Sequence, residues 1–95
     1  MSLSSNGTIS TNGAAGIQLI ANPNGVACKK GVNVTNAAGG SGDGLISIDG
    51  GATYPYYLPA APGSRTILLP DAMAVNVWIK RAGSTDVTGV YADAD

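Results

Sequence analysis

The sequence predicts an all-β fold, either an antiparallel β-sandwich or a jelly-roll-like barrel of about seven to eight short strands. Short runs rich in Val, Ile, Leu, Thr and Tyr alternate with clusters of Gly, Pro, Asn and Asp, as strands alternate with turns. Evidence for helices is thin, since the chain has no Glu and only three Lys, and Gly or Pro interrupts nearly every ten-residue window.

The first half of the chain contains an arm and two or three strands. Residues 1–15 are rich in Ser, Gly, Asn and Thr, and we expect a flexible N-terminal arm that either frays or orders against a neighbouring subunit. Residues 16–95 then form a single sandwich domain. GIQLIA at 16–21 is a strand that ends at the turn residues 22–25, and VACKK at 26–30 leads into the alternating strand GVNVTN at 31–36. The glycine-rich segment 37–44 is a flexible loop.

Five further strands follow from the same alternation. GLISID at 44–49 ends in an Asp-Gly-Gly turn, and in TYPYYL at 53–58 we expect Tyr54, Tyr56 and Leu58 to share a face near a sheet edge. SRTILLP spans 64–70. AVNVWIKR at 74–81 is the clearest strand, with Val75, Val77 and Ile79 on the inward face and Asn76, Trp78 and Lys80 on the opposite one. TDVTGVY at 85–91 closes the sheet, and YADAD at 91–95 trails off as an acidic end.

Composition excludes several classes of protein. A length of 95 residues fits one domain, and the net charge of −1 argues against nucleic-acid binding, which depends on clustered Lys and Arg. The lone Cys28 cannot form an intramolecular disulfide and is expected in the core. With no apolar run of membrane-spanning length and no signal-peptide pattern, we expect synthesis in the cytoplasm without membrane association.

The chain offers little for catalysis, and we expect no enzyme activity, no cofactor and no metal. It has no His, and therefore lacks the commonest general base and metal ligand. Most of its six Asp fall in predicted turns or at the C-terminal end, where local hydrogen bonding explains them. The loop at 39–47 partly matches calcium-binding and phosphate-binding loops, but it lacks the stacked repeats or the following helix that those sites need.

The sparse charges and the one tryptophan are the candidate contacts for a partner protein. Two basic pairs stand at strand ends and could meet acidic patches, or they could simply be solvated. Trp78 faces away from Val77 and Ile79, and either lines a second core layer or lies in an interface. The predicted partner interface comprises Lys29, Lys30, Arg65, Trp78, Lys80 and Arg81.

Three segments resemble small bacteriophage virion proteins of the capsid decoration (cement) or head-fibre type. They are I-x-I-D-G from Ile46 to Gly50, a Leu-Pro-Ala hairpin from Leu58 to Gly63, and the closing strand from Val75 to Ile79 with Gly83, Ser84 and Val87 after it. The resemblance implies a β-sandwich on the outer capsid surface of the virion that binds the major capsid protein and stabilises the shell. It also implies a homo-oligomer, with a trimer favoured.

Two other functions remain open from the sequence. The domain could bind a host glycan or another receptor through Tyr54, Tyr56, Tyr57 and Trp78, since aromatic side chains stack on sugars. It could instead be a minor tail or fibre component of a virion. Copy number per particle separates a decoration protein from a tail or fibre part.

Overall fold

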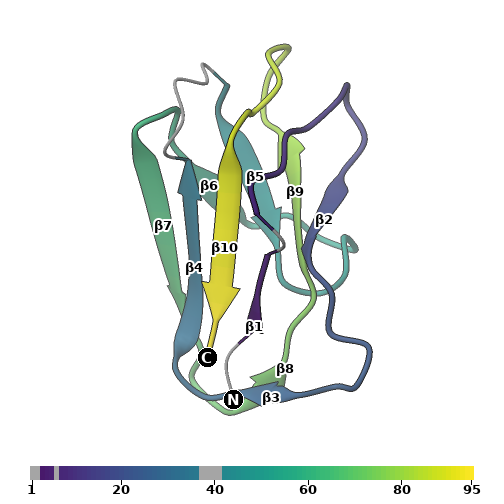
Figure 1. The fold of residues 1–95 in the computed structure, drawn as a ribbon, viewed down its shortest axis with the longest axis vertical. Coiled ribbons are helices and arrows are strands. Elements are labelled where there is room, and N and C mark those ends of the chain that lie inside the picture. Colours follow the sequence, from purple (N-terminus) through teal and green to yellow (C-terminus); the bar gives the residue numbers. More distant parts are fainter. Residues whose placement is uncertain (1–2, 6, 37–41) are drawn as a thin grey trace.

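Two four-stranded antiparallel sheets pack face to face in the computed structural model, which describes residues 3–5, 7–36 and 42–95 (Figure 1). In spatial order, sheet A contains β1 (Leu3–Ser4), β10 (Val90–Ala94), β4 (Gly31–Asn36) and β7 (Gly63–Leu68). Sheet B contains β2 (Ile17–Ile20), β9 (Val77–Arg81), β5 (Gly44–Ser47) and β6 (Tyr56–Leu58). A small third sheet pairs β3 (Ala27–Cys28) with β8 (Met73–Ala74) at one end of the sandwich.

The predicted all-β fold is confirmed, and it is a sandwich with ten strands in the described residues. Three of those strands have only two residues each, β1, β3 and β8. The other seven correspond to the predicted count. Two-residue strands give no alternation pattern, which explains why the sequence does not reveal them. In the described part of the chain, no helix is long and apolar enough to cross a membrane.

The core lies between the sheets and is built from aliphatic side chains. In β4, Val32 and Val34 are fully buried while Asn33 is exposed, and in β9 Val77 and Ile79 are buried while Trp78 is half-buried. Each fully buried Val, Leu or Ile contributes about 1.5–3 kcal/mol relative to an exposed one. The core also includes Cys28, as predicted. Its members are Leu19, Ile20, Cys28, Val32, Val34, Ile46, Leu58, Ile67, Leu69, Val75, Val77, Ile79, Val87, Val90, Ala92 and Ala94.

The N-terminal segment differs from the flexible arm expected at residues 1–15. Its described residues lie against β10: Leu3 and Ser4 pair with Ala94 and Asp93, and Ile9 forms a bridge with Val90. Leu3 and Ile9 are partly buried against the core. These two apolar side chains are the physical reason that the segment completes sheet A of its own chain.

The C-terminal end also differs from the trailing acidic tail that we expected. Residues 90–94 form β10, a central strand of sheet A that lies between β1 and β4. Along it, Ala92 and Ala94 are buried while Tyr91 and Asp93 face solvent. Alanine is a weak strand former, but its small side chain fits between two sheets. The expected flexible loop at 37–44 lies mostly outside the described residues.

Candidate interaction surfaces

The outer face of sheet A is a polar surface that all four strands share. Ser4, Asp93, Asn33 and Thr66 stand opposite one another in register, on β1, β10, β4 and β7. The Thr66 hydroxyl donates to Asn33 Oδ1 at 2.6 Å, and Asn33 Nδ2 donates to Asp93 Oδ1 at 3.3 Å. These bonds fix a row of amide, hydroxyl and carboxylate groups that still faces solvent. We call this surface face A.

A hollow of about 300 Å³ lies on face A beside this row. Its lining consists of Lys30, Gly31, Asn33, Thr66, Leu68, Asp93 and Asp95. Gly31 leaves the space open, and it must be glycine, because a Cβ atom there would stand 2.6 Å from the Ile67 carbonyl oxygen. Leu68 is 79% exposed at the rim, which is unusual for a large apolar side chain in a strand. The hollow therefore combines polar groups with an exposed apolar anchor.

Sheet B presents an aromatic outer face, which we call face B. Trp78 lies opposite Gln18 and Ser47 in register, and Lys80 lies opposite Leu45, which in turn pairs with Tyr57. The Lys80 ammonium stands 4.5 Å from the centre of the Tyr54 ring, a cation–π contact. Face B therefore differs chemically from the polar row on face A.

Tyr54 does not share a face with Tyr56 and Leu58, so that prediction is wrong. Tyr54 precedes β6, and its hydroxyl lies near Gly16 and Gly51, beside the Trp78 ring. Tyr56 instead lies beneath the Arg65 guanidinium, 5.5 Å from it. The reason is that Pro55 interrupts the strand, and the alternation of residues 53–58 does not continue across it.

The loop before Tyr54 is fixed by the carboxylate of Asp49. The Ser47 hydroxyl donates to Asp49 Oδ1 at 2.5 Å, and the Thr53 hydroxyl donates to Oδ2 at 2.6 Å. The Thr53 backbone N–H adds a third bond, to Oδ1, at 3.0 Å. These donors, the Ser47 hydroxyl above all, hold the pKa of Asp49 well below its usual range. The carboxylate thus acts as a structural acceptor that positions the aromatic residue after it.

A second carboxylate hydrogen bond orders the exposed Tyr57. Its hydroxyl donates to Asp43 Oδ2 at 2.5 Å. This bond, together with desolvation and the negative charge of Asp43, raises the pKa of Tyr57 above its ordinary value. Tyr57 is 45% exposed, so its ring remains available on face B.

The structure does not bring the six predicted interface residues together on one surface. Lys29 and Lys30 lie in the turn before β4, and Lys30 forms an exposed 3.6 Å ion pair with Asp95 beside the hollow. Arg65 stands on the edge strand β7. Trp78 and Lys80 point outward from β9 on the opposite sheet, so the six residues are divided between the two sheets.

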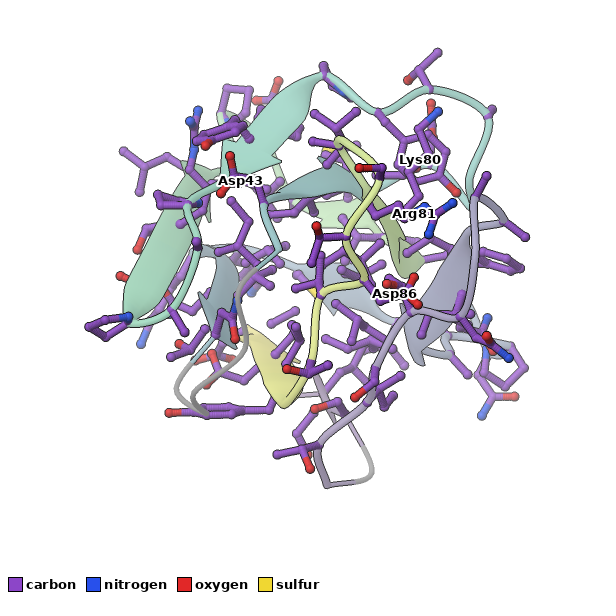
Figure 2. All side chains as sticks on the ribbon, turned by 90° about the horizontal axis from the view of Figure 1, so that it is seen from above. Asp43, Lys80, Arg81 and Asp86 are labelled. Carbon is purple, nitrogen blue, oxygen red and sulfur yellow. The ribbon has the colours of Figure 1, made fainter. Side chains whose placement is uncertain are left out.

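Arg81, the last of the six, closes β9 at one end of the sandwich. Figure 2 looks onto this end and shows Arg81 close to Asp86, with Asp43 apart from them. Arg81 reaches Asp86 at 3.5 Å and also donates to the Ser84 carbonyl at 3.2 Å. Asp86 in turn accepts from the Thr11 hydroxyl. Through Asp86, these contacts join the loop after β9 to the N-terminal segment. Arg81 therefore stabilises the fold of its own chain.

Several residues of face A escaped the sequence analysis as site candidates. The alternation in GVNVTN does place Asn33 outward, but an outward polar residue is the usual state of a strand. Asp93 and Tyr91 were missed because their segment read as a tail. Asn33, Tyr91 and Asp93 share a face only because β10 pairs with β4, and local sequence does not determine which strands pair.

Within the described residues, no group of three Cys, Asp or other ligand-type side chains is placed to hold a metal ion. No protein-family model matches the chain. No curated protein matches it significantly either.

Proposed function

We propose that this chain is a non-enzymatic structural protein of a bacteriophage virion. In this proposal it is a decoration protein that binds the outer capsid surface and bridges neighbouring major capsid subunits. The observation that supports the proposal most is face A, where side-chain hydrogen bonds join a polar row across β7, β4 and β10 beside a hollow of about 300 Å³. An open surface with exposed polar and apolar groups across a whole sheet suits attachment to another protein better than it suits capture of a small molecule.

Face A combines exposed apolar side chains with a central polar row. Tyr91 and Leu68 are 41% and 79% exposed, and both stand next to the polar row. Burial of these side chains would supply apolar area, while Asn33 and Asp93 would fix the register through hydrogen bonds.

Co-sedimentation with phage capsids tests this proposal. The purified chain is mixed with capsid particles that lack it, and the bound copies per particle are counted. We expect hundreds of copies on each particle. We also expect Asn33→Arg to reduce occupancy at least about tenfold, since a bulky charge in the centre of an interface is costly.

The matched control is Gln18→Arg, which adds the same charge to an exposed strand position on face B. It should leave capsid binding unchanged. A handful of copies per particle would instead indicate a tail or fibre component. Equal losses for the two variants, or no binding at all, would refute attachment through face A.

Binding of a host glycan through face B is a second candidate. Three aromatic side chains, Tyr54, Tyr57 and Trp78, belong to this face, and sugars stack on such rings. Glycan-array binding that Tyr57→Ala abolishes and Tyr91→Ala preserves would favour this function. Binding to capsids without any glycan signal would exclude it.

A further inference from the structure

The strand β7 is the one long, regular edge of the sandwich in the part of the chain that the structure describes. The opposite edge of sheet A, β1, has two residues. In sheet B, β6 has three residues between Pro55 and Pro59, and β2 shifts register between Gln18 and Ile20. By contrast, β7 has six residues that pair with β4 without interruption. Short or bulged edges resist further pairing, whereas a long regular edge invites it.

Three residues of β7 direct their backbone hydrogen-bonding groups away from β4. Gly31 of β4 exchanges both backbone bonds with Asp95, on the side of β10. Because antiparallel strands alternate, Val32, Val34 and Asn36 then bond toward β7, where they face Ile67, Arg65 and Gly63. The N–H and C=O groups of Ser64, Thr66 and Leu68 therefore point away from the sheet.

We propose that β7 pairs with β7 of a second copy of this chain, antiparallel and centred on Thr66. In this register Thr66 stands opposite its own counterpart, and Ser64 stands opposite the partner's Leu68. All three outward-pointing residues then donate and accept hydrogen bonds across the two-fold axis. Sheet A becomes a continuous eight-stranded sheet with the spatial order of its strands mirrored.

Charge selects this register over its neighbour. Arg65 is the only charged residue of β7. A two-fold centre on Arg65 would place the two guanidinium groups directly opposite each other, which is destabilising. Centred on Thr66, Arg65 instead faces the partner's Ile67. The Arg65 guanidinium stays over Tyr56 at 5.5 Å, where it shields the open side of the sandwich.

The exposure of β7 agrees with a covered position in a dimer. Ser64, Arg65, Thr66 and Leu68 are exposed in the single chain, and only Ile67 is buried. A dimer would also place two copies of face A side by side on one surface. The proposed symmetry is two-fold, whereas the resemblance implies a trimer. A ring of three would need β7 to pair with a different edge, and β1 is too short for that.

Analytical ultracentrifugation of the full chain in the absence of capsids tests this inference independently of the proposed function. We expect a monomer–dimer equilibrium in the unmodified protein. Thr66→Lys and Thr66→Asp each place like charges opposite each other at the two-fold axis. Each should weaken dimerisation at least about fivefold. An equimolar mixture of the two variants should restore the dimer, because lysine then faces aspartate.

Two controls separate charge at the axis from other effects. Thr66→Val removes the hydroxyl that donates to Asn33 but adds no charge, and should dimerise like the unmodified chain. Thr35→Lys places a charge on the outer face of the inner strand β4, and should also dimerise. A monomeric or trimeric mass for the unmodified chain would overturn the inference, as would charge variants that dimerise undiminished.

Discussion

Thr11 and Asp86 are 75 residues apart in the sequence, and the threonine hydroxyl donates to Asp86 Oδ1 at 3.1 Å. The same hydroxyl oxygen accepts a bond from the Val87 backbone N–H at 2.8 Å. Thr11 is buried, and Arg81 contacts the same Asp86 oxygen at 3.5 Å. This contact joins the N-terminal segment to the loop before β10, and it explains why a segment of Ser, Gly, Asn and Thr is ordered along the sandwich.

Thr11→Val is expected to destabilise the fold by about 1–3 kcal/mol, because it keeps the side-chain shape but leaves the buried Val87 N–H without its acceptor. Chemical denaturation at neutral pH measures the loss. Thr8→Val is the matched control, since Thr8 lies exposed in the same segment and its replacement should stay within about 0.5 kcal/mol. Equal stability of the two variants would show that the segment is not anchored through Thr11.

Gly16→Ala is expected to expel Tyr54 from its place beside Trp78. A Cβ atom on Gly16 would collide with the Tyr54 hydroxyl and would stand 3.5 Å from Trp78 Cε3. Such overpacking costs about 1–3 kcal/mol.

Fluorescence of Trp78, the only tryptophan, reports this change directly. Its emission should shift to longer wavelength in Gly16→Ala as water reaches the ring. Gly83→Ala is the control, because nothing lies within 4 Å of a Cβ there. An unchanged emission in Gly16→Ala would contradict the packing of face B.

The Asp49 carboxylate is expected to make stability depend on acid. Its pKa is depressed in the folded state, so its contribution is present above the unfolded value of 3.8 and is lost as pH falls below that value. Asp49→Asn should therefore reduce the stability of the fold at neutral pH. It should also make stability depend less steeply on pH in the acid range. Thermal unfolding across this range measures both effects. Asp71→Asn, at an exposed turn aspartate, should retain the slope of the unmodified chain. If Asp49→Asn lost stability with falling pH as steeply as the unmodified chain does, the Asp49 carboxylate would not have this role.

Local pattern was enough to predict the central strands. Alternation along GVNVTN predicts the bounds of β4. The same period predicts the inward positions Val75, Val77 and Ile79, because one face of each strand packs on the core. Prediction failed where local pattern and tertiary pairing disagree. The end of the chain, Tyr91 to Asp95, reads as an acidic tail, but its two alanines fit the narrow space between sheets and place it beside β4.

The candidate surfaces were less predictable than the fold, for the same reason. Lys30, Lys80 and Arg81 were chosen for charge alone, and each has a partner within the chain. The polar row of face A depends instead on register, since Asn33 meets Asp93 and Thr66 only after three strands have paired. The open edge of β7 likewise follows from strand order, which no local run of residues encodes.

Tyr57 and Asp43 provide a final prediction, at alkaline pH. The hydrogen bond to Asp43 favours the protonated phenol, so the pKa of Tyr57 is raised in the folded state. This contribution to stability is fully present below the unfolded pKa of 10.0 and is lost as pH rises through the folded value. Asp43→Asn removes the negative charge, and should bring the ionisation of Tyr57 back toward its ordinary range.

Phenolate absorbance during an alkaline titration measures this ionisation, and Tyr57→Phe identifies which of the four tyrosines accounts for the late step. Asp71→Asn again serves as the control and should leave the titration curve unchanged. If Asp43→Asn and the unmodified chain titrate identically, the Asp43 contact does not persist in solution. In that case the Tyr57 hydroxyl is free, and face B offers a ligand one more hydrogen-bonding group than the structure indicates.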